Sequence, residues 1–259
     1  MAVTGPAELL AAWEAGLALQ DGGRALLLHR AARPEAGTDA LLSVPAGERA
    51  ADLFALRRAL FGERMQVKLA CADPECGAAM EFELDAAELG AARPRPPEDG
   101  LRVTEGGWSV VFRLPSVADL TAVSATAAHD PAEARRLLGA RCVLTAVRDG
   151  RTAGQGRREA DPEELERLPE AVLKRFAEAV EEADPGAEVT LNIACPECGT
   201  TTPAELDIAA YLWTELDAWA RDVLLDVHLL ASAYGWSEPE ILALSPLRRR
   251  YYLELCADV

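Results

Sequence analysis

Two pairs of cysteines, each set in the same short module, constrain the fold of this 259-residue chain more than any other feature. The first pair stands in Cys71-Ala-Asp-Pro-Glu-Cys76-Gly and the second in Cys195-Pro-Glu-Cys198-Gly. Surrounding residues recur at one fixed offset: Val67, Leu69, Pro74, Glu75, Cys76, Gly77, Glu83, Leu84 and Asp85 match Val189, Leu191, Pro196, Glu197, Cys198, Gly199, Glu205, Leu206 and Asp207. Each copy has the pattern of a strand, a Pro/Gly turn with two thiols, a return strand and a helix-capping Asp. The sequence therefore predicts an internal repeat of two zinc knuckles.

The cysteine spacing predicts a single metal site that both modules share. A structural zinc takes four tetrahedral ligands, and two cysteines around a turn supply two of them. The pairs are separated by about 118 residues instead of the roughly 20 of a zinc ribbon, which raises the loop-closure cost by only about 1.6 kcal/mol. Structural zinc contributes on the order of 10 kcal/mol. We therefore expect one structural zinc bound by Cys71, Cys76, Cys195 and Cys198. Two local disulfides, or cysteines that have lost their metal, are the alternatives.

Charge and composition narrow the classes of partner. The formal net charge is −17, and a protein of this charge is repelled by the phosphates of nucleic acid at long range. With 50% hydrophobic residues the chain can bury a core and divide into two or three subdomains. We see no basic leader and no apolar stretch of roughly 18 residues, so we expect a cytoplasmic protein without a membrane partner. A reducing compartment favours metal binding over disulfides.

The expected fold class is α+β and mainly helical, with a long C-terminal helix and several short helices. The predicted segments are a helical subdomain (1–62), the first knuckle (63–97), an inserted α+β subdomain (98–185), the second knuckle (186–208) and a C-terminal helical hairpin (209–259). In the first segment we expect a loop from Ala31 to Gly47. In the insertion we expect a β-hairpin over 101–114 and helices whose N-caps are Ser116, Asp130 and Asp161.

The C-terminal segment has the most regular helical pattern of the chain. Six apolar positions follow a 4, 3, 4, 3, 4 spacing that gives one continuous apolar face: Leu216, Ala220, Val223, Val227, Leu230 and Tyr234. We expect this helix to end at Gly235, a residue suited to a left-handed cap. Ser237 and Ser245 should each start a further short helix.

Signs of catalysis are missing from the sequence. We find no Gly-rich phosphate loop, nucleophile elbow or His-Glu metalloprotease motif, and four cysteines leave zinc no open position for water. We therefore expect no enzymatic activity and no small-molecule substrate.

The run Arg248 to Arg250 lies among acidic residues, which favours surface ion pairs over DNA binding. Aromatic residues gather near one end and are candidates for binding a partner protein: Trp213, Trp219, Tyr234, Trp236, Tyr251 and Tyr252.

The C-terminal half also carries a resemblance to a known family. The motif Cys-Pro-Glu-Cys-Gly, the run Ala-Tyr-Leu-Trp-Thr-Glu-Leu and the long run from Asp226 to Tyr251 resemble the baseplate-protein family of contractile-tailed phages. Similar proteins occur in gene clusters for phage-tail-like contractile injection systems. The resemblance is firmest over Asp207 to Leu255 and looser over the knuckles and the insertion.

The resemblance implies a role in baseplate or hub assembly, as a small component or an assembly factor without enzymatic activity. It implies protein partners from a contractile tail or baseplate, and a place in a tail-like particle as well as in the cytoplasm. The alternative hypothesis is a zinc-containing nucleic-acid-binding or regulatory module, which the net charge disfavours.

Overall fold

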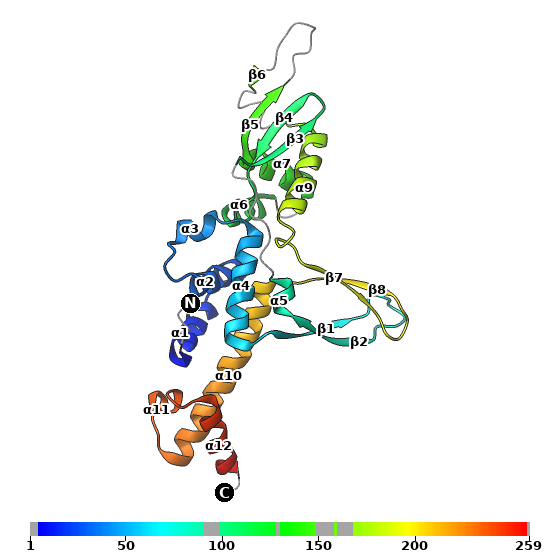
Figure 1. The fold of residues 1–259 in the computed structure, drawn as a ribbon. Coiled ribbons are helices and arrows are strands. Elements are labelled where there is room, and N and C mark those ends of the chain that lie inside the picture. The colour runs from blue at the N-terminus through cyan, green and yellow to red at the C-terminus, as the bar shows by residue number, and fades with distance from the viewer. Residues whose placement is uncertain (1–4, 91–98, 128–129, 149–157, 160–167, 258–259) are drawn as a thin grey trace.

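The computed structural model describes residues 5–90, 99–127, 130–148, 158–159 and 168–257. These residues form a mixed α+β chain that is mainly helical, as the sequence predicts. Figure 1 shows an elongated molecule with a helical body at its middle, an inserted subdomain at one end and the C-terminal helices at the other. Two hairpins project sideways from the body and form what we call the arm.

The body is built from helices of both ends of the chain. Helices α1 (Pro6–Leu17), α2 (Asp21–Ala32) and α4 (Ala46–Phe61) pack with α10 (Ile208–Tyr234). Their shared core includes Trp13, Leu28, Phe54, Leu212 and Leu216. The predicted segments 1–62 and 209–259 therefore share one hydrophobic core, while the exact borders of the five segments stay a prediction.

The loop predicted from Ala31 to Gly47 is wrong in its middle. A short helix, α3 (Thr38–Ser43), forms there, and Leu41 on it is completely buried. Gly37 adopts an extended conformation as the N-cap of this helix. The Gly and Pro residues that suggested a loop flank the helix, and burial of Leu41 stabilises it.

Helix α10 begins and ends as the sequence predicts. Asp207 caps its N-terminus, and Gly235, with φ of 70°, is a left-handed C-cap. Of the apolar face, Leu216, Ala220, Val223 and Leu230 are buried. Tyr234 at the far end is 39% exposed because it lies beyond the body's core. The predicted helices α11 (Glu238–Leu242) and α12 (Pro246–Ala257) follow and fold back on α10.

The inserted subdomain contains an antiparallel sheet in the order β3-β4-β5-β6. The strands are β3 (Leu101–Glu105), β4 (Trp108–Phe112), β5 (Val143–Arg148) and β6 (Arg158–Glu159). The helices are α6 (Val117–Ala127), α7 (Pro131–Cys142) and α9 (Glu170–Ala183). Val110 and Phe112 point into a core with Phe176 of α9, whose ring stacks on Phe112 at a centroid distance of 4.2 Å. The predicted hairpin and the helix starts at Ser116 and Asp130 are confirmed, while the start predicted at Asp161 lies outside the described residues.

Buried polar contacts attach the insertion to the body. The Asp119 carboxylate accepts hydrogen bonds from Arg113, from Arg141 and from both the amide and hydroxyl of Ser116. Ser116 in turn forms a β-bridge with Pro45, directly before α4. Near the C-terminal end of the insertion, the Asp184 carboxylate accepts a 2.9 Å bond from the Gly47 amide. Ser116 and Asp184 therefore attach the insertion at two points to the start of α4.

Candidate metal centre

The arm consists of two antiparallel hairpins that are far apart in sequence. The first pairs β1 (Arg64–Ala70) with β2 (Ala79–Asp85), and the second pairs β7 (Thr190–Ala194) with β8 (Thr201–Glu205). They lie side by side (Figure 1), and the Ala72 amide of the first donates a 3.0 Å bond to the Thr202 hydroxyl of the second. Met80 lies in a small core with cysteines from both hairpins. The sequence predicts each hairpin but gives no sign of how the two pack.

The strand register shows which positions of the repeat are equivalent. Cys71 donates its backbone amide to the Ala78 carbonyl, and Cys195 donates to the Thr200 carbonyl, both at 2.9 Å. The first cysteines of the two pairs therefore occupy the same place at the end of the incoming strand. The turn that follows is two residues longer in the first hairpin than in the second.

This longer turn corrects the single offset expected from the sequence. Val67 pairs with Phe82, and Leu191 pairs with Ala204, so Val67 is equivalent to Leu191 and not to Val189. Leu69 is likewise equivalent to Ile193 and not to Leu191. The fixed offset holds only after the turn, because the two extra residues shift the whole incoming strand.

Both modules end in the helix cap that the sequence predicts. An Asp85 carboxylate oxygen accepts a bond from the Ala87 amide at 2.7 Å, and one of Asp207 accepts a bond from the Ala209 amide at 2.8 Å. The first cap starts α5 (Ala86–Leu89), which has a single turn, and the second starts α10 with 27 residues. The modules thus share a hairpin, a turn and a cap, and differ in the helix that follows.

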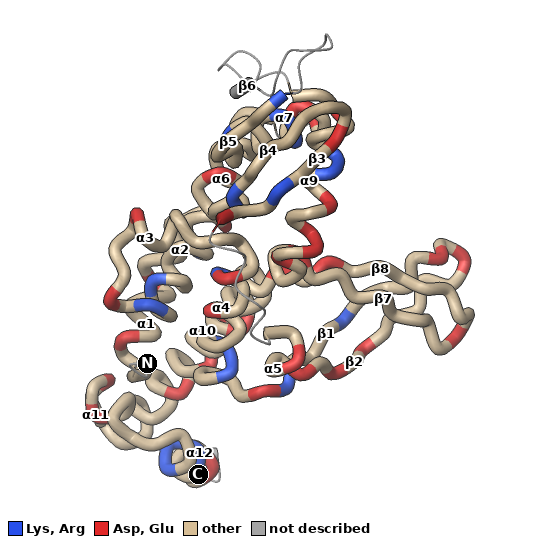
Figure 2. The backbone as a smooth tube through the Cα atoms, turned by 45° about the horizontal axis from the view of Figure 1, so that its top comes forward, with Lys and Arg blue, Asp and Glu red and all other residues tan. Residues whose placement is uncertain are grey.

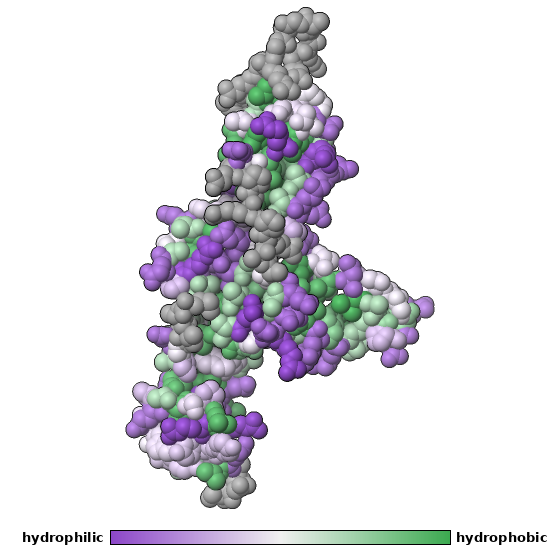
Figure 3. Space-filling view, in the orientation of Figure 1, coloured by the Kyte–Doolittle hydropathy of each residue, from purple (hydrophilic) through white to green (hydrophobic). Residues whose placement is uncertain are grey.

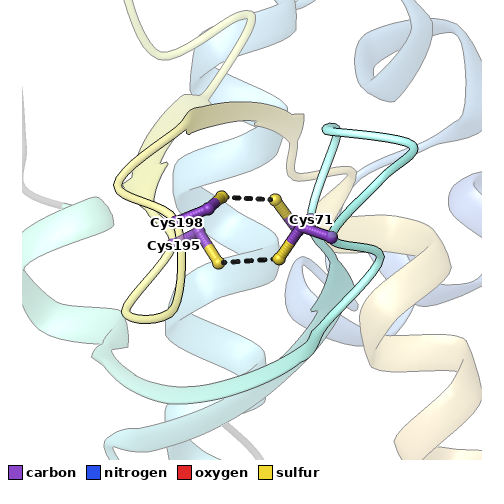
Figure 4. A group of neighbouring side chains, drawn as sticks. Cys71, Cys195 and Cys198 are labelled. Atoms are coloured by element: carbon purple, nitrogen blue, oxygen red, sulfur yellow. Dashed lines mark hydrogen bonds between the residues drawn. The ribbon is translucent and has the colours of Figure 1, made fainter.

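The four cysteines converge where the two hairpins meet, and Figure 4 shows Cys71 opposite Cys195 and Cys198. All four sulfur atoms lie within 4.8 Å of one another. The Sγ atoms of Cys71 and Cys198 are 3.5 Å apart, and those of Cys76 and Cys195 are 3.8 Å apart, so both contacts join one hairpin to the other. Four sulfurs at about 2.3 Å from a zinc ion form a tetrahedron with edges of about 3.8 Å. The donor set therefore fits a tetrahedral metal ion of this size.

The six cysteines of the chain are free thiols in the structure. Cys71 and Cys195 are buried, Cys76 is half-buried and Cys198 is exposed. Cys142 lies in the core of the insertion, and Cys256 lies on α12, far from the four in sequence. Only the set of four forms a group able to hold a metal among the residues that the structure describes.

The sulfurs differ in how readily they ionise. Hydrogen bonds from the side chain and backbone of Thr200 lower the pKa of Cys198 to about 6. The Ala78 amide lowers the pKa of Cys76, but desolvation and the other three sulfurs raise it to about 12. A hydrogen bond from the Asp73 amide likewise lowers the pKa of Cys71, but desolvation and the Cys198 sulfur raise it above its ordinary value. A negatively charged thiolate raises the pKa of the thiols beside it. A bound cation offsets this repulsion, so that all four cysteines can ionise.

Thr200 and Thr202 are site residues that sequence reasoning missed. Hydrogen bonds from Thr200 lower the pKa of Cys198. The Thr202 hydroxyl accepts a hydrogen bond from the Ala72 amide, which joins the two hairpins. Both stand directly after the second cysteine pair, in the run Gly199-Thr-Thr-Thr. A hydroxyl next to a thiol ligand is a signal that could have identified Thr200.

The six aromatic candidates for partner binding occupy three different environments. Trp213 is buried in the body, and Trp219 packs partly buried against the same core. Tyr234, Trp236 and Tyr252 pack on one another, with centroid distances between 4.7 and 5.8 Å. Tyr251 is 60% exposed on α12. The structure therefore leaves Tyr251 as the most accessible of the six.

The chain matches a known protein family over the region that holds these features. A family model described as T4 bacteriophage base plate protein matches residues 35–209, a stretch that spans both hairpins, all four clustered cysteines and the insertion. The arm and the insertion both lie within the stretch that this family model matches. The chain belongs to the T4 bacteriophage base plate protein family, because the match covers well over half of its residues. No curated protein and no solved structure matches the chain.

The family predicted from the sequence is confirmed, but the region of likeness is different. The match ends at Ala209, so almost all of Asp207 to Leu255, where the resemblance is firmest by sequence, lies outside it. The knuckles and the insertion carry the match instead. In the described part of the chain, no helix combines the length and apolar character that crossing a membrane requires.

Proposed function

We propose that this chain is a non-enzymatic, protein-binding component or assembly factor of a contractile, phage-tail-like base plate, with a structural zinc in its arm. The observation that carries the proposal is the family match over residues 35–209. That stretch contains the body's α4, the whole arm and the insertion, which together make up most of the described fold.

The geometry of the four cysteines favours a structural ion over a catalytic one. Four thiolates complete a tetrahedral coordination sphere, so no position remains for a water or a substrate. The ligands come from hairpins on either side of the insertion, from Cys71–Cys76 and Cys195–Cys198. A metal at this point fixes the two hairpins to each other and so sets the direction of the arm.

The surface supports protein partners. Residues 63–90 and 186–207 contain Arg64 and Lys68 as their only basic residues, against seven and four acidic ones, and Figure 2 shows acidic positions along the arm. An acidic arm is complementary to a basic protein surface and repels nucleic-acid phosphates. The proposal therefore includes neither nucleic acid nor membrane nor a small-molecule substrate among the partners.

The test is affinity purification of the tagged chain from its native host, with the co-purifying proteins compared with those of the sedimented particle. Recovery of sheath, tube or base plate proteins supports the proposal, and the tag alone is the control. Presence in the particle identifies a permanent component, and absence from it identifies an assembly factor. Recovery of nucleic-acid machinery, or of no tail protein, contradicts the proposed function.

A further inference from the structure

The two hairpins of the arm contact each other through groups that do not depend on a metal. The Ala72 amide, next to Cys71, donates a 3.0 Å bond to the Thr202 hydroxyl of the second hairpin. Met80 packs with Cys71 and Cys195 in a small core that both hairpins share. These contacts keep the thiols of one hairpin beside those of the other after an ion has left.

Two short sulfur–sulfur contacts in the cluster run across the arm from one hairpin to the other. The Sγ atom of Cys198 lies 3.5 Å from that of Cys71, and the Sγ atom of Cys76 lies 3.8 Å from that of Cys195. Figure 4 draws both contacts. A disulfide has a sulfur–sulfur distance of about 2.05 Å, so each crossing pair needs to close by less than about 2 Å.

The four thiols differ in their access to solvent. Cys198 is exposed, Cys76 is half-buried, and Cys71 and Cys195 are buried. In the space-filling view the arm stands clear of the body (Figure 3). Zinc ligands are thiolates, and the oxidation of thiolates follows their exposure. Cys198 is therefore the sulfur that a small oxidant reaches first, and the thiol of Cys71 lies beside it on the other hairpin.

We propose that the metal centre is a redox switch, in which a peroxide replaces the zinc by two disulfides that cross the arm, Cys71–Cys198 and Cys76–Cys195. The switch rests on the structural zinc of the proposed function. The metal joins the two hairpins under reducing conditions, and the disulfides join them under oxidising ones.

The first disulfide forms in two steps. Peroxide takes two electrons from the Cys198 thiolate, which becomes a sulfenic acid as the O–O bond breaks, and a proton converts the departing hydroxide to water. The Cys71 thiolate then attacks the sulfenic sulfur, the S–O bond breaks, and a second proton gives a second water. The zinc has now lost two of its four ligands and its closed site.

A second peroxide oxidises Cys76 and Cys195 in the same way. In total, one zinc with four thiolates, two peroxides and four protons give a free zinc ion, two disulfides and four waters. The Cys71–Cys198 disulfide joins residues 127 apart in sequence, whereas a disulfide within either pair closes only a turn. Closing a long loop restrains the unfolded chain more than closing a short one. The oxidised arm therefore stays folded without the metal.

The experiment begins with the full chain in its zinc-bound form, and its zinc content is measured before any oxidation. Hydrogen peroxide is then added in steps while a chromophoric chelator records the free ion. We expect two equivalents of peroxide to release one equivalent of zinc, and dithiothreitol with added zinc to restore binding. Cys256→Ser is the control, because it removes the more accessible of the two other thiols, and it should release zinc in the same proportion.

Peptide mapping of the oxidised chain tests which sulfurs are bonded. Trypsin leaves Cys71 and Cys76 in one peptide (69–102) and Cys195 and Cys198 in another (176–221), so only disulfides that cross the arm join the two peptides. A Glu stands directly before Cys76 and directly before Cys198, so a Glu-specific protease then separates the members of each pair. We expect Cys71 bonded to Cys198, and Cys76 bonded to Cys195.

Thermal melting gives a second readout of the crossing disulfides. The oxidised chain should melt at a higher temperature than reduced chain from which a chelator has removed the zinc. Equal melting temperatures overturn the proposal, as does zinc release while the two tryptic peptides stay separate, or zinc that remains bound after two equivalents of peroxide are consumed. A chain purified without zinc contradicts the structural zinc itself and removes the basis of the switch, and the measurement before oxidation distinguishes that failure.

Discussion

Arg57 and Glu215 form a two-point ion pair that joins α4 to α10 across 158 residues of sequence. The Arg57 Nε and Nη2 atoms donate to the two carboxylate oxygens of Glu215 at 2.8 and 2.7 Å. Arg57 is only 2% exposed and also donates to the carbonyls of Gly62 and Arg64, at 2.7 Å each. One buried side chain thus connects the body, the long helix and the first strand of the arm.

Removing the carboxylate should therefore destabilise the whole body. Glu215→Gln leaves the buried Arg57 without its counter-charge, and we expect a loss of about 3 kcal/mol in the free energy of unfolding, measured by urea titration. The control is Glu63→Gln, which breaks the exposed pair with Arg58 and should change stability by less than about 0.5 kcal/mol. Equal effects of the two substitutions would show that the buried pair has no special role.

The metal centre predicts a defined stoichiometry. The purified protein should contain one equivalent of zinc, because its four sulfurs form one group and a structural zinc takes four ligands. Cys198→Ser should lose the metal and lower the melting temperature sharply, while Cys142→Ser should keep it. Metal analysis and thermal melting measure both effects. Two equivalents, no metal with intact disulfides, or identical melting curves would rule out the shared site.

Gly16 and Gly22 should respond in opposite ways to substitution by Ala, because only Gly16 is closely packed. A Cβ atom at Gly16 would overlap the Trp213 ring, so Gly16→Ala should destabilise the body by about 1 to 3 kcal/mol. At Gly22, in the exposed first turn of α2, a Cβ meets nothing within 4 Å. Gly22→Ala should stabilise the protein by about 0.4 to 1 kcal/mol. Urea titrations of both variants test this, and a tolerated Gly16→Ala would contradict the described packing.

Asp119 should make the protein sensitive to acid. Burial raises the pKa of this carboxyl, but Arg113 and Ser116 lower it well below its ordinary value. The unfolded chain therefore takes up the proton first, and the stabilisation is complete above about pH 4 and lost as the pH falls further. Asp119→Asn should cost about 3 kcal/mol at pH 7 and flatten the pH dependence of stability in acid.

The control for Asp119 is the exposed N-cap Asp130, whose carboxylate accepts bonds from the Ala132 and Glu133 amides. Asn is about as good a cap as Asp, so Asp130→Asn should change little at any pH. Unfolding curves measured at several pH values compare the two variants. A steep acid dependence that persists in Asp119→Asn would assign it to other groups.

The net charge of −17 predicts negligible binding to duplex DNA at physiological salt. A fluorescence anisotropy titration with labelled duplex measures this directly. Tight binding under those conditions would overturn the choice of protein partners and favour the regulatory alternative.

Much of the local structure could be predicted from the sequence because each feature depends on nearby residues. The caps at Asp85 and Asp207, the hairpin over 101–114 and the end of α10 at Gly235 follow from local chemistry. The set of four cysteines could also be predicted, because metal binding by thiols leaves a spacing in the sequence.

What could not be predicted depends on contacts between distant segments. The shared core of α1, α2, α4 and α10 is one such feature. Helix α3 is another, since it is stabilised by burial of Leu41 rather than by its own sequence. The longer gap between Cys71 and Cys76 is visible in the sequence, but the shift of the incoming strand is not. Val67 and Leu69 happen to match Val189 and Leu191 in residue type, although the hairpin register makes them equivalent to other residues.

The attachment of the insertion also bears on how this chain can change over evolution. The insertion follows the first hairpin and precedes the second, and those two hairpins contact each other at Ala72 and Thr202 and around the four cysteines. Its core is separate from the core of the body. A change within the insertion's own core can therefore leave the geometry of the two hairpins intact, because the contacts between the hairpins do not pass through that core.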